Sequence, residues 1–206
     1  MITKVLLSKV NGVPTNNVYA DIRYINEENF EDIIKLYNIV NDGLDGKSWL
    51  KFRDHDYLQE ILNRGGFIVG CYVGDEIIAS ALCETPSIPD IELMNEIGIS
   101  AEDFVNTYIS GFVMVHPSYR GNSLQSILLD TRIKLSQIRG KKFVLTTVAV
   151  ENVYSLNNIL NAGFKVGTTR TKEDGTIRYV LYKDISGSYS VDDIREGWYN
   201  TKYETA

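Results

Sequence analysis

Hydrophobic residues recur along the first third of the chain with the spacings of one strand and two helices. Apolar and polar residues alternate over 19–25, which is typical of a short strand with one buried face. Phe30, Ile33 and Tyr37 then recur at three- and four-residue intervals, so they would share one face of a helix. A second helical repeat covers 57–62 and is followed by a pair of glycines, which commonly end helices.

The middle of the chain alternates between apolar runs and one long polar segment. Two apolar runs, 67–73 and 77–83, flank a Gly-Asp pair and predict a β-hairpin. Residues 86–104 contain two of the four prolines and many acidic residues, which predicts a loop that carries a short helix. Residues 108–115 form another apolar run and predict a strand.

The second half of the chain completes the predicted order of elements. Helices are predicted at 124–138 and 152–160, and strands at 143–150, 164–169 and 177–185. The whole order predicts an α/β (α+β) protein with about seven strands and about four helices. One domain over 19–185 is expected, with an N-terminal extension over 1–18 and a C-terminal tail over 186–206.

The stretch 113–125 joins an apolar strand to an amphipathic helix through the turn His-Pro-Ser-Tyr-Arg-Gly-Asn-Ser. A turn of this kind directs several unpaired backbone N–H groups of the helix N-terminus at one point. Such a cluster of N–H groups binds phosphate, and Arg120 would add a positive charge beside it. The segment is therefore a candidate phosphate site, with an ordinary strand–helix turn as the alternative.

This turn resembles the acetyl-CoA-binding motif of the GNAT N-acetyltransferases, which is Arg/Gln-x-x-Gly-x-Gly/Ala at the start of a helix. Arg120 matches the first position, whereas Ser123 stands where the family usually has Gly and Gln125 where it has Gly or Ala. A second stretch, Asn152-Val153-Tyr154-Ser155 through Ala162-Gly163-Phe164, resembles the family's Asn-x-x-Ala…Gly-Phe. The order of elements over 19–185 is also similar to that of the family.

The resemblance implies a mixed, mostly antiparallel central sheet flanked by helices, with acetyl-CoA as cosubstrate. In GNAT proteins the fourth strand separates from the fifth, and the pantetheine arm lies between them. The backbone of Met114 and Val115 would then pair with the pantetheine amides, and Asn152 would face the pantetheine besides capping its helix. The implied cofactor-binding residues are Met114, Val115, Arg120, Gly121, Asn122, Ser123, Leu124, Gln125, Ser126 and Asn152.

Acetyl transfer also needs a group that accepts the ammonium proton and a group that stabilises the leaving thiolate. Glu84 and Tyr108 are the candidate catalytic residues, and the alternative for each is a solvated or packed side chain. Many GNAT proteins carry a Tyr four residues before the Gly of the Gly-Phe pair, but this chain has Ile159 there. Tyr154 lies five residues away and replaces it poorly, so catalysis would rest mainly on positioning.

The composition narrows the class of protein further. The chain has 206 residues and a net charge of −6, which argues against broad binding to nucleic acid or anionic membranes. An acidic surface would favour cationic amine acceptors, although many soluble proteins are acidic for no such reason. Cys71 and Cys83 are expected to be buried free thiols, and no spacing of Cys and His indicates a metal site. No apolar run is long enough to span a bilayer and no signal peptide is recognisable, so a cytoplasmic protein is expected.

Three functions stay open from the sequence. The leading hypothesis is an N-acetyltransferase that moves an acetyl group from acetyl-CoA to a primary amine by direct attack in a ternary complex. A non-catalytic CoA-binding sensor or interaction module is the alternative, and a nucleotide binder on the same helix N-terminus is the third. Residues 43–48 end like a P-loop, but Asn41 stands where that motif needs Gly. Neither the acceptor nor the choice between monomer and homodimer follows from the sequence.

Overall fold

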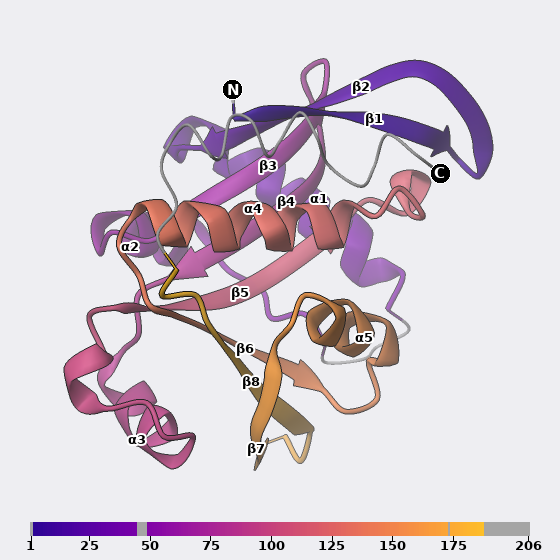
Figure 1. Ribbon diagram of the computed structural model, residues 1–206. Coiled ribbons are helices and arrows are strands. Elements are labelled where there is room, and N and C mark those ends of the chain that lie inside the picture. Colours follow the sequence, from indigo (N-terminus) through magenta and orange to yellow (C-terminus); the bar gives the residue numbers. More distant parts are fainter. Residues whose placement is uncertain (1, 45–48, 173, 188–206) are drawn as a thin grey trace.

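Eight strands form one sheet through the described part of the protein. The computed structural model describes residues 2–44, 49–172 and 174–187. The sheet order is β1-β2-β3-β4-β5-β6-β8-β7, and β5–β6 is the one parallel pair among the described strands (Figure 1). The strands are β1 (Thr3–Val10), β2 (Val13–Ile25), β3 (Phe67–Val73), β4 (Glu76–Glu84), β5 (Thr107–Val115), β6 (Phe143–Ala149), β7 (Lys165–Thr171) and β8 (Ile177–Asp184).

Helices cover both faces of this sheet (Figure 1). α1 and α2 pack on one face over the middle strands, whereas α4 packs on the opposite face. α5 packs beside α4 over β6 and β8, and α3 packs on the opposite face of those two strands. The helices are α1 (Phe30–Asp42), α2 (His55–Asn63), α3 (Ile88–Glu96), α4 (Leu124–Ile138) and α5 (Val153–Asn161).

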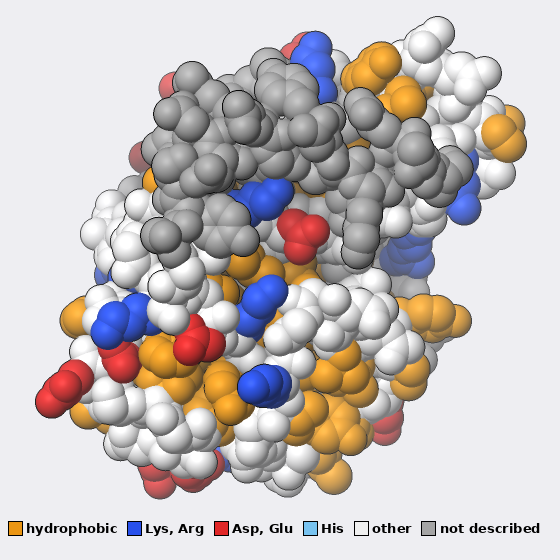
Figure 2. All heavy atoms as spheres, viewed as in Figure 1, with side chains coloured by type: hydrophobic (Ala, Val, Ile, Leu, Met, Phe, Trp, Pro, Cys, Tyr) orange, Lys and Arg blue, Asp and Glu red, His pale blue; other side chains and the backbone are white. Residues whose placement is uncertain are grey.

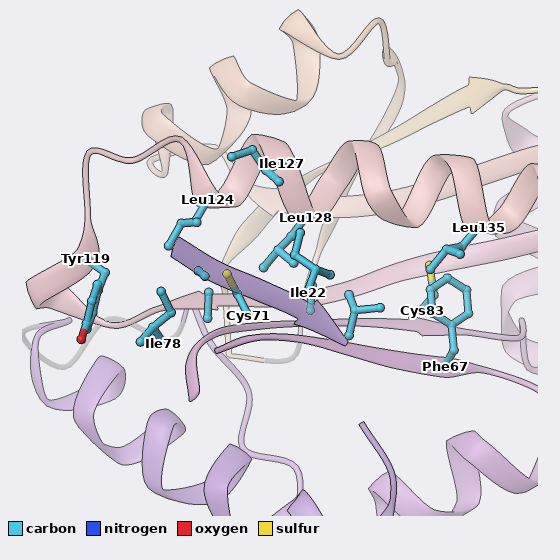
Figure 3. Close-up of a cluster of buried hydrophobic side chains, with 14 of the residues drawn as sticks. Ile22, Phe67, Cys71, Ile78, Cys83, Tyr119, Leu124, Ile127, Leu128 and Leu135 are labelled. Carbon is cyan, nitrogen blue, oxygen red and sulfur yellow. The ribbon is translucent and has the colours of Figure 1, made fainter. Parts of the chain in front are cut away.

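The main core lies between α4 and strands β1 to β4. Leu124, Leu128 and Leu135 share one face of α4 and pack against the sheet, where Ile22 and Phe67 meet them (Figure 3). All five side chains are buried. Burying an apolar side chain of this size contributes about 1.5–3 kcal/mol. This packing fixes α4, and with it the turn that precedes the helix.

The N-terminal residues form a hairpin that extends the sheet. β1 pairs antiparallel with β2, and the connection is Asn11-Gly12, with φ angles of 51° and 75°. Asn-Gly is the preferred pair for a two-residue hairpin turn, so the sequence does carry this signal. The strand predicted at 19–25 accordingly begins earlier, at Val13.

The predicted fold class is confirmed, because the protein is a mixed α/β fold around a mostly antiparallel sheet. The described residues form eight strands and five α-helices, against about seven and about four expected. β1 is the additional strand, and α3 is the short helix expected within 86–104. No helix in the described part of the chain is long and apolar enough to cross a membrane.

Candidate active site

β5 and β6 pair along their first halves and then separate. Thr107–Ser110 of β5 pairs with Phe143–Thr146 of β6, and no further pairing joins the two strands within the described residues. On its other side β5 stays paired with β4 as far as Val115, across a β-bulge. A bulge adds one residue to a strand and bends it, which turns β5 away from β6. The sheet therefore contains a fork, where one edge of β5 has no strand partner among the residues that the structure describes.

A cavity of ≈ 250 Å³ lies in this fork and is lined from both faces of the sheet. α4 and α5 line one side, through residues that include Gln125 and Ile159. The connection between α1 and α2 lines the other side, with Trp49 and Arg53, and the β7–β8 hairpin contributes Arg178. Because the strands have parted here, the cavity extends through the sheet instead of stopping at its surface.

The open edge of β5 presents the backbone of Val113 and Val115, which corrects the prediction for Met114. The backbone N–H of His116 donates to the carbonyl of Ile78 in β4 (2.8 Å). Alternate residues of a strand direct their backbone groups to alternate neighbours, so those of Met114 face Ser80 of β4. The backbone groups of Val113 and Val115 point the other way, toward the fork.

The turn before α4 presents a row of unpaired backbone N–H groups. Within the described residues, the N–H groups of 121–126 donate to no acceptor, whereas Ile127 already donates to the carbonyl of Ser123 (3.0 Å). The side chain of Leu124 packs in the core (Figure 3), so only its backbone is available. Gly121 (φ 80°) and Ser123 (φ 54°) both adopt left-handed conformations. Glycine does so without strain and serine does not, yet the row of N–H groups is intact and is a candidate anion site.

Asn122 anchors the turn to the N-terminal hairpin. Its Oδ1 accepts hydrogen bonds from the backbone N–H groups of Ser8 (2.8 Å) and Lys9 (3.1 Å) and from the Ser8 hydroxyl (3.0 Å). Its Nδ2 donates to the carbonyls of Lys9 (2.8 Å) and Tyr119 (2.9 Å). The side chain is buried, so Asn122 positions the turn, and only its backbone N–H is available to the candidate anion site.

Two positive charges lie close to the turn, on different elements. The side chain of Lys9 lies against Gly121, and a Cβ added to Gly121 would stand 2.4 Å from its Nζ. The Arg120 side chain reaches toward Gly43, just after the C-terminus of α1. Lys9 was not selected from the sequence, because the hairpin that carries it was not assigned there.

Gln125 and Ser126 connect the first turn of α4 to α5. Gln125 donates from Nε2 to the Ser155 hydroxyl (2.9 Å) and accepts at Oε1 from Asn158 (2.9 Å). The Ser126 hydroxyl lies 3.4 Å from Oδ1 of Asn158. Asn152 caps α5 by accepting from the backbone N–H of Ser155 (3.2 Å), and it also lines the cavity. These side chains hold the cavity wall together.

Ile159 of α5 brings no hydroxyl into the cavity, although many GNAT proteins carry a Tyr at the corresponding position. Ile159 lines the cavity and packs in the core between α4 and α5. Tyr154 is 84% exposed, so it points away from the interior of the fork. An acid for the leaving group therefore does not come from either position.

Glu84 stands at the end of β4, where β5 leaves β6. Its Oε2 accepts a hydrogen bond from the Tyr57 hydroxyl of α2 (2.5 Å), and a Cβ on Gly111 would lie 3.5 Å from its Oε1. Burial, and then the hydrogen bond to Glu84, raise the pKa of Tyr57 above its ordinary value of 10.0. The hydroxyl therefore remains a donor and holds the carboxylate beside the fork. A carboxylate in this position can accept a proton from a group bound there.

Tyr108 does not line the cavity, and this placement corrects its selection as a candidate base. Its hydroxyl donates to the carbonyl of Gly65 (2.7 Å), and its ring packs edge-on against Phe67 at 5.5 Å between centroids. Neighbouring residues of a strand point to opposite faces, so Ile109 reaches the cavity while Tyr108 enters the core. The packed alternative for this side chain is the correct one.

Several basic residues line the cavity and were not selected from the sequence, because they come from distant segments. Arg132 could have been noticed from the sequence, since it is a charged residue on the apolar face of α4. It is buried, its guanidinium donates to the carbonyl of Leu82 (3.0 Å), and burial lowers its pKa. Figure 2 shows Lys and Arg side chains among hydrophobic ones over the part of the molecule that holds α5 and the β7–β8 hairpin. The basic lining residues are Lys51, Arg53, Arg132, Lys172 and Arg178.

No family model matches the sequence, and no curated protein matches it either. The fold, in contrast, matches solved acetyltransferases. The acetyltransferase of GNAT family from Streptococcus pneumoniae is 14% identical, with a TM-score of 0.61 over 80% of this chain and 98% of that chain. yncA from Salmonella typhimurium, solved with its cofactor acetyl-CoA, is 16% identical, with a TM-score of 0.64 over 83% and 96%. The ribosomal-protein-S18-alanine N-acetyltransferase from Escherichia coli is 13% identical, with a TM-score of 0.62 over 84% and 97%. At these identities the likeness establishes a shared fold.

Proposed function

We propose that this chain, which has the fold of the GNAT N-acetyltransferases, transfers an acetyl group from acetyl-CoA to a primary amine. The observation that carries the proposal is the fork between β5 and β6. It brings an unpaired strand edge, the row of N–H groups before α4 and the carboxylate of Glu84 to one cavity. Each of these corresponds to a chemical requirement of acetyl transfer from a thioester to an amine.

The residues present fit a CoA molecule. The backbone groups of Val113 and Val115 would pair with the two amides of the pantetheine arm, as an added strand pairs with a sheet edge. The N–H groups of 121–126 would hold the pyrophosphate, with Lys9 and Arg120 as the nearby positive charges. Asn152 lines the cavity, and its side-chain Nδ2 donates to no acceptor among the described residues, so this side chain would face the pantetheine.

Glu84 would act as the base. The carboxylate accepts a proton from the bound ammonium, directly or through one water, and the amine nitrogen then attacks the acetyl carbon. The new C–N bond forms as the C–S bond breaks, and the sulfur leaves with the electron pair as a thiolate. The acylated nitrogen gives its second proton to this sulfur or to water, which leaves the neutral amide. An ordinary thiol has a pKa of about 8.5, so this thiolate is a tolerable leaving group without a hydroxyl at Ile159. Rate would come mainly from holding the two substrates in one cavity.

The test is calorimetric titration of the full chain with acetyl-CoA, CoA and ATP, followed by measurement of thiol release with a panel of amines. Micromolar binding of the CoA species and amine-dependent thiol release are expected. Binding without release for any amine would favour the sensor, which is the second candidate because Ile159 replaces the family's Tyr. ATP binding in preference to CoA would favour a nucleotide binder. Absence of CoA binding would overturn the proposal.

A further inference from the structure

The cavity in the fork is positively charged, although the chain as a whole is not. The protein has a net charge of −6, yet five basic side chains line the cavity and Glu84 is the one acidic side chain among the described lining residues. Charged groups that face one cavity act together on whatever binds there, because the protein walls screen them less than water does. The acidic net charge led us to expect a cationic amine as acceptor, whereas the charge of this cavity favours an acceptor with an anionic group.

Four of these basic residues lie away from the helices that would hold CoA. Lys51 and Arg53 belong to the connection between α1 and α2, which pack on the face opposite α4. In β8, Tyr179 packs toward α5 and Tyr182 packs toward α3 on the opposite face. Arg178 precedes Tyr182 by four residues and so shares its face of the sheet. Lys172 follows β7 in the same hairpin and lines the same cavity.

These four side chains have few partners. Among the described residues, none of them forms an ion pair with a carboxylate. Arg53 stacks on the ring of Tyr57 at 3.9 Å from its centroid. Arg178 makes one long contact, from Nη2 to the carbonyl of Thr147 (3.4 Å), and its buried Nε–H has no acceptor. Asp174 is near enough to act on Arg178 electrostatically without contacting it.

We infer that the acceptor is a small amine that also bears a carboxylate, as a free amino acid does. This inference rests on the proposed function and names its substrate class. A carboxylate pairs with a guanidinium through two parallel N–H groups, and Arg178 lines the cavity with only one long contact from Nη2 to the protein among the described residues. Lys51 and Lys172 line the same cavity and would attract the same carboxylate.

The same charges would assist the chemistry at the amine. A positive surrounding disfavours the ammonium form, so it lowers the pKa of the acceptor amine and makes the proton easier to give to Glu84. The amine lone pair then forms the C–N bond, and the C–S bond breaks with its electron pair going to sulfur. The second amine proton passes to that sulfur, so the products are the N-acetylated acid and the CoA thiol. The carboxylate takes no part in the bond changes and serves to orient the amine.

The experiment measures thiol release from acetyl-CoA with pairs of amines that differ in one carboxylate. L-Alanine is compared with L-alaninamide, and L-phenylalanine with L-phenylalaninamide, while putrescine represents a cationic amine. We expect kcat/KM to be about tenfold or more higher for the carboxylate member of at least one pair, since a charge-assisted hydrogen bond has this magnitude. Lys172→Gln and Arg178→Gln should each reduce that ratio at least about threefold. Lys35→Gln, on the exposed surface of α1, is the control that should leave the ratio unchanged.

Titration of each variant with acetyl-CoA separates this inference from the function on which it rests. Unchanged acetyl-CoA affinity together with a reduced ratio supports a carboxylate site on the acceptor side. A preference for putrescine or for the amides would overturn the inference, and so would a ratio that neither variant changes. A protein that binds acetyl-CoA but acetylates no carboxylate-bearing amine would overturn it while the cofactor site stands. A protein that binds no acetyl-CoA would remove the proposed function and the inference with it.

Discussion

The two walls of the cavity differ in how their polar side chains are used. On the α4–α5 wall these side chains bind other parts of the protein, because Gln125 bridges to α5 and Asn152 caps that helix. On the opposite wall Lys51 and Lys172 have no side-chain partner among the described residues, and Arg178 has one long contact. One wall thus offers backbone groups in fixed positions, and the other offers charged side chains.

This difference matches what each wall would recognise. Backbone groups can bind the amides and phosphates that every CoA molecule carries, so the fold itself can fix the positions of these backbone groups. Charged side chains recognise the charge that distinguishes one acceptor from another. The α4–α5 wall, with the turn before α4, is the proposed cofactor wall, and it should respond to substitutions that disturb the backbone. The opposite wall is the proposed acceptor wall, and it should respond to substitutions that remove a charge or a titratable group.

The largest expected effect is on the acceptor side, at the candidate base. Glu84→Gln removes the proton acceptor and keeps the shape, so we expect kcat/KM to fall about 10²–10³-fold with acetyl-CoA affinity unchanged. Thiol-release kinetics and calorimetric titration measure the two quantities. Glu92→Gln, at an exposed position of α3, is the control. An activity loss smaller than about threefold would remove Glu84 from the proposed mechanism.

On the cofactor wall, the largest effect is expected from Asn122→Ala. It leaves two backbone N–H groups and two carbonyls without their partner, so we expect a loss of about 2–3 kcal/mol in the free energy of unfolding. Weaker acetyl-CoA binding should accompany it, because β1 no longer holds the turn. Denaturant unfolding and calorimetry measure both. Ser8→Ala removes one hydroxyl hydrogen bond and should cost less than about 1 kcal/mol; equal effects of the two variants would contradict the anchoring role.

A moderate effect is expected from Tyr57→Phe, which releases the carboxylate of Glu84. We expect kcat/KM to fall about three- to tenfold, since one hydrogen bond to a charged group is lost. Because the pKa of Tyr57 is raised, its contribution to stability is complete below its ordinary pKa of 10.0 and is lost as the pH rises from there through the raised value. The wild type should accordingly keep the Tyr57 contribution through pH 10. Tyr19→Phe, in the N-terminal hairpin, is the control; an equal loss there would refute the positioning role.

The smallest effect is expected at the strained residue of the turn. Ser123→Gly relieves a left-handed conformation that costs a non-glycine residue about 1–2 kcal/mol, while the greater freedom of unfolded glycine offsets part of this gain. We expect a net gain of about 0.5 kcal/mol in the free energy of unfolding, with acetyl-CoA binding retained. Ser100→Gly, where φ is −67°, should instead lose stability. A destabilised Ser123→Gly variant would show that the Ser123 side chain stabilises the turn.

Much of the fold could be predicted because its signals are local. The spacing of Leu124, Leu128 and Leu135 predicts the buried face of α4, and the Gly-Asp pair predicts the β3–β4 hairpin. The Asn11-Gly12 turn was an equally local signal that was missed, because the polar residues on both sides of it hid the strand pattern. Its omission also hid Lys9 and the anchor for Asn122.

The site could be predicted only in part. Successive residues of β5 direct their backbone groups and side chains alternately to opposite sides, and this alternation decides which groups face the fork. A shift of one residue directs the backbone of Val113 and Val115, and not that of Met114, to the open edge. The same alternation places Tyr108 in the core beside Phe67. A bulge shifts this alternation by one residue. Because the bulge depends on how β5 pairs with β4, the periodicity along one strand cannot reveal it.

The sequence by itself determined the order of the elements, the strand–turn–helix that presents backbone N–H groups, and the carboxylate at the end of β4. These depend on residues close together in the chain, where short-range geometry sets the outcome. Only the tertiary structure decided that β5 leaves β6, that Tyr57 holds Glu84, and that basic residues from the α1–α2 connection and the β7–β8 hairpin face one cavity. Charge in a cavity depends on which distant segments the fold brings together, and packing decides that.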